Sequence, residues 1–477
     1  MSTTTPTPEL SAGFLKSLAR IAGAGRLLTD PADCWPYGYD NSRLHALPRG
    51  VVFAADEAQI MALVALCRDA GVSLVARGRG TGTTGATVPD RGGIVLSFER
   101  MDSILRIAPE DRLAVVQPGV LNEQLQRAVG AVGFFWPPDP TSAASCTIGG
   151  NLAYNSAGPR AVKYGTPREN TLGLVAVNGR GERLRTGVLT TKGVVGYDLT
   201  RLIIGSEGTL ALITEATLKL TPLPEAKRTL RAAYADIHAA SAAVSAIMAQ
   251  PVIPCALEIM DAAAIRTVQR YAGLDLPEGV GALLMIEVDG PAAGIDQSVA
   301  AVAAAADHAG LIELRRAESA EEVTSLWKTR KALSPALRHI APKKINEDIV
   351  VPVSRMGELI EGLEGLSRES GVQIVNFGHA GNGNIHVNLL IDPDDPVAVE
   401  SAHRCLDEMF SLVLRLGGTL SGEHGVGIAK RAFVEREIDA PVLALMRDIK
   451  RQFDPAGILN PGKGFPEETA EHPARQR

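Results

Sequence analysis

Hydrophobic and polar positions along the first half of the chain follow two different periods. Short apolar runs have the length and residue content of strands, and the segments between them are amphipathic with helical spacing. The pattern predicts strands over 51–54, 72–77, 94–98 and 113–120, and helices over 56–71 and 121–133. These elements indicate an α/β domain. A further strand-rich block over 172–184 and 210–224 ends at two nearby prolines.

Alanine-rich helical segments become frequent after residue 225. Helices are expected over 238–250 and 294–310, and strands over 255–260, 281–290 and 347–354. Helices packed on one face of a largely antiparallel sheet would bury the apolar sides of these elements, which predicts an α+β layer. A helical pattern within 440–465 stops at Pro455 and Gly457, and the tail after it can return to the first domain. We predict three parts: 1–224, 225–425 and 426–477.

Length, charge and cysteine spacing restrict the class of protein. A chain of 477 residues at about 150 residues per domain gives two or three domains. The net charge of -6 argues against nucleic acid as the main partner, since phosphate binding needs clustered basic surface. The five cysteines are far apart and include no CxxC pair, so we expect reduced thiols in a cytosolic compartment.

The start of the chain and its hydropathy bear on location. MSTTTPTPEL is polar and lacks the order of residues found in a signal peptide, and no apolar run approaches the roughly 18 residues of a membrane span. We therefore expect a cytoplasmic protein. Peripheral contact with the inner membrane stays open.

Three loops of small residues follow predicted strands or precede them. The first, RGRGTGTTG over 77–85, satisfies the GxGxxG pattern, but Pro89, Gly92 and Gly93 lead straight into a strand where a Rossmann unit needs a helix. Strand, glycine loop and strand instead form a nest of backbone N–H groups that can cradle phosphates. The second loop is TIGGN over 147–151 and the third is GSEGTL over 205–210. Three such loops suit an elongated dinucleotide, and plain structural turns are the alternative.

These loops, together with PPDP, HAGNGNIHVN, SGEHGVG and ILNPGK, form an ordered set of motifs from about residue 40 to 464. In this order they resemble FAD-dependent D-2-hydroxy-acid dehydrogenases of the vanillyl-alcohol-oxidase, or PCMH, type. Within that group the chain looks most similar to D-lactate dehydrogenases that do not use NAD, and to relatives acting on glycolate or D-2-hydroxyglutarate. The resemblance implies an α+β protein with a two-subdomain FAD-binding domain and a cap domain with a largely antiparallel sheet.

The resemblance also implies which residues contact FAD. The expected set is Arg77, Gly78, Arg79, Gly80, Thr81, Gly82, Thr83, Thr84 and Gly85 at the pyrophosphate, and Pro138, Asp139, Thr147, Gly149, Gly150, Asn151, Glu207, Gly208 and Asn460 elsewhere along the cofactor. Some relatives attach FAD covalently through a histidine at the position of Thr81. A threonine cannot form that bond, so we predict noncovalent FAD.

Two histidines and an acidic pair are candidates for a metal site. His379 and His386 flank a glycine- and asparagine-rich turn that enters a strand, and Glu423 precedes His424 in a second glycine-rich segment. Two imidazoles and one carboxylate suit Zn2+ or Mn2+ and leave coordination positions open for substrate. In the resembling enzymes His379, His386 and Glu423 would be ligands and His424 the general base. A polar turn, a solvated charged turn, or direct substrate binding without metal are the alternatives.

Substrate residues are expected on a helix and on the histidine strand. Arg330 matches the family's substrate-binding arginine, because a guanidinium fork suits a carboxylate, and Ser334 lies one turn further on. Asn388 shares a strand face with His386. The lysine that D-2-hydroxyglutarate enzymes carry at this position is replaced here by Asn346, which favours a monocarboxylate, although Lys343 and Lys344 are near.

The expected function is therefore oxidation of D-lactate to pyruvate by hydride transfer to FAD, with electrons passed to a quinone, a cytochrome or an electron-transfer flavoprotein. A D-2-hydroxyglutarate dehydrogenase and a glycolate oxidase flavin subunit are the alternative enzymes. From another class, a flavin- or metal-binding module without turnover is also considered. A homodimer is left open.

Overall fold

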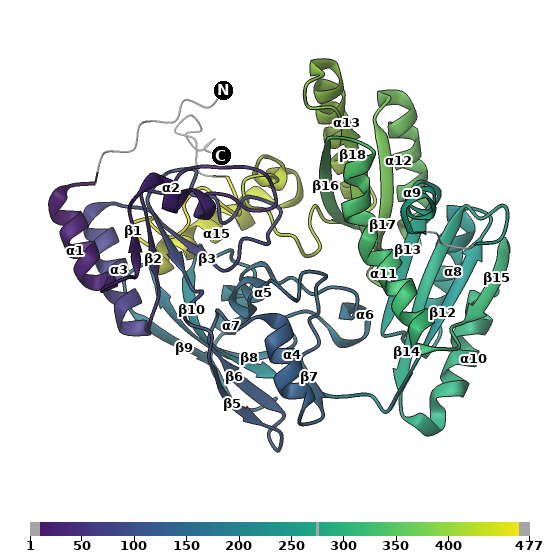
Figure 1. Cartoon of the computed structure of the whole chain (residues 1–477), viewed down its shortest axis with the longest axis horizontal. Helices are drawn as coiled ribbons and strands as arrows, with labels where there is room; N and C mark the ends of the chain where they lie inside the picture. Colours follow the sequence, from purple (N-terminus) through teal and green to yellow (C-terminus); the bar gives the residue numbers. More distant parts are fainter. Residues whose placement is uncertain (1–9, 273–275, 467–477) are drawn as a thin grey trace. The chain divides into compact units, whose positions relative to one another are not determined.

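A computed structural model describes residues 10–272 and 276–466, which fold as two compact units (Figure 1). The first unit contains the described parts of 1–156, 166–222 and 423–477, and the second contains 157–165 and 223–422. The expectation about residues 1–9 at the start of the chain lies outside the described residues. Among the residues described, no helix is both long and apolar enough to cross a membrane.

The first sheet of the first unit has the order β1-β2-β4-β3, with β2, β4 and β3 parallel and β1 antiparallel. Its elements are α1 (Ala12–Ala22), β1 (Leu27–Leu28), α2 (Pro31–Cys34), β2 (Gly50–Phe53), α3 (Glu57–Ala70), β3 (Leu74–Arg77) and β4 (Ile94–Ser97). Helix α3 begins where the Asp56 carboxylate accepts from Gln59 N–H and ends at Gly71, whose left-handed φ of 63° suits glycine. Residues of α1, α3 and the sheet form one apolar core.

The second sheet of the first unit is antiparallel, in the order β5-β6-β10-β8-β9. Its strands are β5 (Ile104–Ala108), β6 (Leu113–Val116), β8 (Thr171–Asn178), β9 (Arg183–Gly187) and β10 (Ala211–Lys219); the neighbouring elements are α4 (Asn122–Gly130), β7 (Phe134–Phe135), α5 (Ile148–Tyr154), α7 (Leu199–Ile203) and β11 (Thr221–Pro222). Fully buried Trp136 belongs to the core beneath this sheet, and its indole N–H donates to the Asn170 carbonyl oxygen over 2.9 Å.

The last segment of the chain completes the first unit. Helices α14 (Val434–Glu437) and α15 (Ala440–Phe453) precede a tail that returns to the first sheet. Leu74 N–H donates to Ile458 O over 2.8 Å, and Asn460 N–H donates to Leu74 O over 2.9 Å. The tail therefore runs parallel to β3, and the Asn460 side-chain amide donates to Ala86 O, just after the first glycine loop, and to Glu207 O.

A seven-stranded antiparallel sheet forms the second unit, in the order β15-β12-β14-β13-β17-β18-β16. The strands are β12 (Ala226–Tyr234), β13 (Ala256–Asp261), β14 (Ala282–Gly290), β15 (Leu311–Arg316), β16 (Lys343–Val350), β17 (Gln373–His379) and β18 (Asn384–Ile391). The expected strand over 347–354 thus begins earlier and ends at Val350, because Pro352 cannot donate to the ladder.

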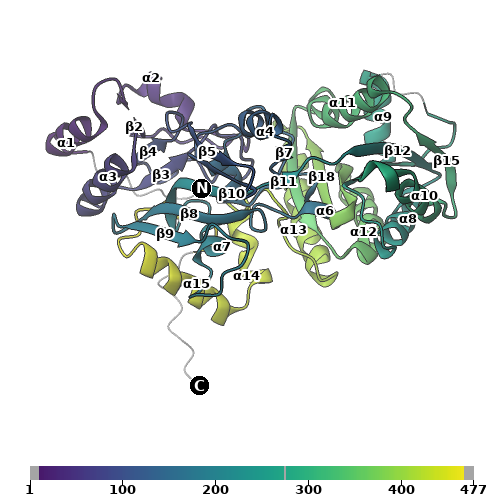
Figure 2. The same ribbon diagram turned by 90° about the horizontal axis from the view of Figure 1, so that it is seen from below.

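Helices cover both faces of this sheet, which corrects the expectation that they would lie on one face. Figure 2 shows α9 (Ala262–Ala272) and α11 (Ala320–Ala336) on one side of the strands and α8 (Ile237–Ala249), α10 (Ile295–Ala306) and α12 (Met356–Ser370) on the other. Helix α13 (Pro396–Arg415) packs against α12, and α6 (Ala161–Tyr164) joins this unit as a short excursion from the first. The central strands β13, β14, β17 and β18 are buried on both faces, so a one-sided layer would leave one of their faces in water.

Candidate active site

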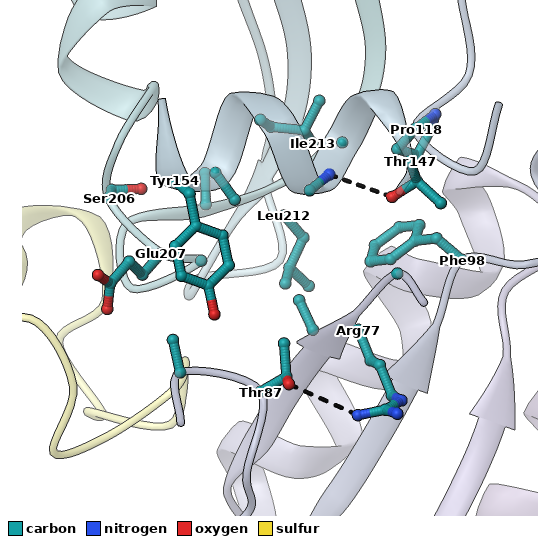
Figure 3. A pocket seen from close by; sticks show the side chains of 18 of the residues that line it. Arg77, Thr87, Phe98, Pro118, Thr147, Tyr154, Ser206, Glu207, Leu212 and Ile213 are labelled. Carbon is teal, nitrogen blue, oxygen red and sulfur yellow. Dashed lines mark hydrogen bonds between the residues drawn. The ribbon is translucent and has the colours of Figure 1, made fainter. Parts of the chain in front are cut away.

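A pocket in the first unit lies where the three glycine-containing loops meet (Figure 3). Arg77 and Gly78 line it at the end of β3, Gly149 and Gly150 at the start of α5, and Glu207 before β10. Of the residues predicted to contact FAD, those that line this pocket are Arg77, Gly78, Thr147, Gly149, Gly150, Glu207 and Gly208. The loops that are far apart in the sequence therefore share one cavity.

Close packing explains two of the glycines. A Cβ on Gly78 would lie 2.4 Å from Thr147 Oγ1, and one on Gly82 would lie 2.5 Å from the Tyr154 hydroxyl oxygen. Thr147 is also the N-cap of α5, because its Oγ1 accepts from Gly150 N–H over 3.2 Å. The first loop and α5 thus approach each other backbone to side chain, and only glycine leaves room for this contact.

Several predicted cofactor residues instead make contacts that hold the loops. The Arg77 guanidinium donates to Tyr39 O over 2.6 Å, and Gly85 N–H donates to Asp40 over 3.0 Å. Arg79 pairs with Glu99 near the surface. Further contacts of this kind involve Thr84, Asn151 and Asn460. For all the predicted cofactor residues, including Gly80, Thr81, Thr83, Pro138 and Asp139, contact with the cofactor stays a prediction.

Glu207 and Tyr154 are two polar residues in the lining of this pocket. Glu207 has a left-handed φ of 53°, and its carboxylate accepts from Val426 N–H and Gly427 N–H over 2.5 and 2.9 Å. Burial raises the pKa of this carboxyl, although the two N–H donors oppose the shift. The Tyr154 hydroxyl is buried and makes no hydrogen bond among the described residues, and burial raises its pKa well above the ordinary value.

Sequence reasoning missed Tyr154 and the apolar lining of the pocket. Tyr154 lies one helical turn beyond Gly150, so the i, i+4 spacing from the glycine turn could have found it. Phe98, Leu212 and Ile213 also line the pocket, but their strands carry no local signal for it. An apolar cavity with small-residue turns and an orphaned hydroxyl fits the flat, partly apolar rings of a flavin.

In the second unit, His379 ends β17 and His386 lies on the adjacent β18. A short turn joins the two strands, and a Cβ on Gly383 in this turn would lie 1.9 Å from Val351 O, so the turn requires glycine there. The imidazole rings meet edge to face, and their Nε2 atoms are 3.4 Å apart. Both side chains are buried, at 6% and 8% exposure. The predicted histidine pair therefore converges.

Two buried carboxylates lie next to the Nδ1 atoms of the histidines. Sequence reasoning did not identify them. Glu258 on β13 accepts from His379 Nδ1 over 2.5 Å, and Asp348 on β16 has an oxygen 3.7 Å from His386 Nδ1. A carboxylate acceptor favours the His379 tautomer with its proton on Nδ1, and Nε2 then faces the Nε2 of His386. Burial alone would raise the pKa of Glu258, but the neighbouring His379 and Arg330 side chains outweigh it and lower this pKa.

Arg330 on α11 faces the same side of the sheet. Its Nε and Nη2 both donate to Glu258 Oε2, over 2.8 and 2.7 Å, and its guanidinium stacks on Phe377 with Cζ 4.8 Å from the ring centre. Glu258 therefore occupies the edge of the guanidinium formed by Nε and Nη2. The remaining nitrogen, Nη1, is available to a substrate carboxylate.

Ser334 and Asn388 meet through a lysine. Lys344 Nζ donates to Ser334 Oγ over 2.6 Å and to Asn388 Oδ1 over 3.4 Å. Lys344 lies two residues before Asn346 on β16, so the two side chains share a strand face. The absence of lysine at 346 does not remove positive charge from this face, which corrects that argument for a monocarboxylate.

Glu423 and His424 begin the last segment of the first unit. The His424 carbonyl accepts from the Thr84 hydroxyl over 3.2 Å, which ties this segment to the first glycine loop. Gly422, the last residue of the second unit, donates its N–H to Asp348 over 2.9 Å. That Glu423 joins the two histidines, and that His424 faces the substrate, stay predictions.

Known families and proteins match nearly the whole chain. Residues 48–187 match an FAD binding domain, and residues 223–464 match the C-terminal domain of FAD linked oxidases. The chain is 37% identical over 457 residues to the "Glycolate oxidase subunit GlcD" of Bacillus subtilis (strain 168), covering 96% of each. It is 32% identical over 445 residues to the "D-lactate dehydrogenase [cytochrome], mitochondrial" of Arabidopsis thaliana, covering 92% of this chain and 78% of that protein.

A solved structure supports the fold. Substrate-bound p-cresol methylhydroxylase superposes with a TM-score of 0.79 over 95% of this chain and 97% of its own, at 17% sequence identity. This likeness confirms the expected two-domain PCMH-type architecture. At that identity it shows the fold alone.

Proposed function

The chain belongs to the FAD-linked oxidases, and from this premise we propose that it oxidises D-lactate to pyruvate. It is an FAD-linked oxidoreductase of the group whose relatives are named glycolate oxidase subunit and D-lactate dehydrogenase. The observation that carries the proposal is the pair of facing imidazoles, His379 and His386, on the same sheet face as the Arg330 guanidinium. A 2-hydroxy acid offers a carboxylate to the guanidinium and a neighbouring hydroxyl to the histidine side.

The distance between the imidazoles supports a metal ion at this site. Two nitrogens bound about 2.0–2.1 Å from a tetrahedral Zn2+ lie about 3.3–3.4 Å apart, and the Nε2 atoms of His379 and His386 are 3.4 Å apart. With the Glu423 carboxylate they make an N2O donor set that suits Zn2+ or Mn2+. Such an ion would lower the pKa of the substrate hydroxyl.

The first-unit pocket would hold FAD without a covalent bond. Gly78, Gly149 and Gly150 leave room for close approach of the cofactor, and the Tyr154 hydroxyl offers a hydrogen bond that the protein itself does not use. Bound FAD would supply the two-electron acceptor for the hydride that leaves C2. Thr81 offers no imidazole for attachment.

Each remaining residue has one task. Arg330 Nη1 holds the substrate carboxylate, with the guanidinium fixed by Glu258. A ring nitrogen of His424 is the proposed acceptor of the hydroxyl proton. Asn388 Nδ2 donates to Val375 O and His386 O, so its role is to hold the histidine strand and, through Oδ1, the Lys344 ammonium.

Glycolate is the second candidate substrate, because the 37% identical relative is named a glycolate oxidase subunit. D-2-Hydroxyglutarate is the third, because Lys344 offers a cation beside Ser334. The electron acceptor proposed is a quinone, a cytochrome or an electron-transfer flavoprotein.

Anaerobic mixing of the purified flavoprotein with D-lactate, L-lactate, glycolate and D-2-hydroxyglutarate tests the proposal. We expect D-lactate to bleach the flavin absorbance fastest and L-lactate not to bleach it. Faster bleaching by glycolate or D-2-hydroxyglutarate would move the assignment to that substrate. No bleaching by any of the four would contradict a 2-hydroxy-acid dehydrogenase.

A further inference from the structure

Glu258 bridges the two parts of the proposed substrate face. The side chain is 1% exposed and lies on β13, between the histidine strand β17 and the strand β14. Its oxygens have different partners: Oε1 accepts from His379 Nδ1 over 2.5 Å, and Oε2 accepts from Arg330 Nε and Nη2 over 2.8 and 2.7 Å. One carboxylate therefore contacts both the proposed metal ligand and the proposed anion site.

On the histidine side, this contact fixes which nitrogen can bind a metal. A carboxylate acceptor at Nδ1 keeps the proton there and directs the Nε2 lone pair toward the Nε2 of His386. The same contact makes Nε2 a stronger electron-pair donor to a metal ion. Loss of such a partner typically weakens metal binding by about 10- to 100-fold.

On the arginine side, the same carboxylate holds a buried cation in one orientation. The Arg330 side chain is 9% exposed, with Glu258 along one edge and the Phe377 ring on its face. These two contacts leave the flexible side chain few rotamers, so Nη1 is preorganised for an incoming carboxylate.

We propose that Glu258 is a positioning residue that sets both the metal affinity of the His379 and His386 pair and the substrate affinity of Arg330. This inference rests on the proposed function for the roles of the three partners. It goes beyond that function because it makes the two affinities depend on one buried carboxylate that contacts neither metal nor substrate.

The substitution Glu258→Gln keeps the shape and removes the charge. Calorimetric titration of Zn2+ into the FAD-loaded, chelator-stripped full chain should give a dissociation constant roughly 10- to 100-fold higher than for the wild type. The KM for the substrate that bleaches the flavin should rise by a similar factor. Glu287→Gln is the matched control, because Glu287 is also buried in this sheet but contacts Lys227, Thr229 and Trp327. Its Zn2+ affinity and KM should stay within about twofold of the wild-type values.

A second variant and a second readout keep the inference testable if Glu258→Gln does not fold. Glu258→Asp is one methylene shorter and cannot reach both partners, so Zn2+ affinity or KM must still change. Nitrogen-15 NMR of histidine-labelled wild-type protein without metal should show His379 with its proton on Nδ1.

Unchanged Zn2+ affinity and KM in both variants would overturn the inference, and so would a proton on Nε2 of His379. The proposed function fails by a different result, namely no flavin bleaching by any 2-hydroxy acid in the wild type. If the wild type bleaches but binds no Zn2+ or Mn2+, the metal role is contradicted, and the NMR result and KM decide the inference about Glu258.

Discussion

The cofactor pocket of the first unit and the histidine face of the second are built from different kinds of residue. The pocket is lined by small and apolar residues, and its Arg77 and Glu207 are engaged by backbone groups. The histidine face instead concentrates buried ionisable side chains that contact one another, such as Glu258 with His379 and Arg330. Ligand binding at the first surface should therefore depend on the space between its atoms, and ligand binding at the second should depend on charge. Adding a methyl group should disrupt the first, and removing a charge should disrupt the second.

The largest effect is expected from the proton acceptor. His424→Ala should slow flavin reduction by the best substrate by about 10²- to 10⁴-fold, because general base catalysis contributes on that order. Flavin content should not change, since removal of an imidazole adds no bulk to the pocket. Stopped-flow absorbance under anaerobic conditions measures the rate, and the exposed His403→Ala is the control. A rate within threefold of wild type would remove His424 from the mechanism.

A buried carboxyl group in the second unit, that of Asp261, should make the free energy of unfolding depend on pH. Burial raises the pKa of Asp261, which accepts from Ala264 N–H and Asn376 N–H, from 3.8 to about 6. The folded state then binds more protons than the unfolded state between these values, so the free energy of unfolding should fall by about 3 kcal/mol as pH rises from about 4 to 6 and level off above 6. Urea denaturation across this range measures it. Asp261→Asn should remove this fall, and an identical fall in the variant would contradict the assignment.

The size of the side chain at position 78 should determine the FAD affinity of the first unit. Gly78→Ala would place a Cβ 2.4 Å from Thr147 Oγ1, so the loop and α5 must separate at a cost of about 1–3 kcal/mol. We expect the dissociation constant of FAD to rise roughly tenfold or more, measured by fluorescence titration of the apoprotein. Gly130→Ala is the matched control, because no atom lies within 4 Å of its added Cβ. Equal FAD affinity in both variants would show that the contact with Thr147 is not limiting.

The smallest effect concerns substrate choice. Lys344→Met removes the ammonium beside Ser334 and Asn388, and kcat/KM for D-2-hydroxyglutarate should fall about tenfold while that for D-lactate changes less than threefold. Lys343→Met serves as control, because adjacent strand residues point to opposite faces. An equal fall for both substrates would give Lys344 a structural role instead.

The local features of the molecule could be predicted from the sequence alone. The glycine loops and the histidine hairpin were predictable because spacing and residue type are properties of one short segment. Glu258 was not, because it lies 121 residues from the histidine that it contacts and its immediate neighbours in the strand are apolar. The excursion of 157–165 into the second unit was missed for the same reason: its Lys163 pairs with Asp289, 126 residues away.

The central claim is that His379 and His386 share one divalent ion. Crystals of the FAD-loaded protein grown with Zn2+, with diffraction data collected on both sides of the zinc absorption edge, test it most directly. We predict an anomalous peak about 2.0–2.1 Å from Nε2 of both histidines, with the Glu423 carboxylate as third ligand. No peak between the two imidazoles, or a peak bound only by other residues, would contradict the account.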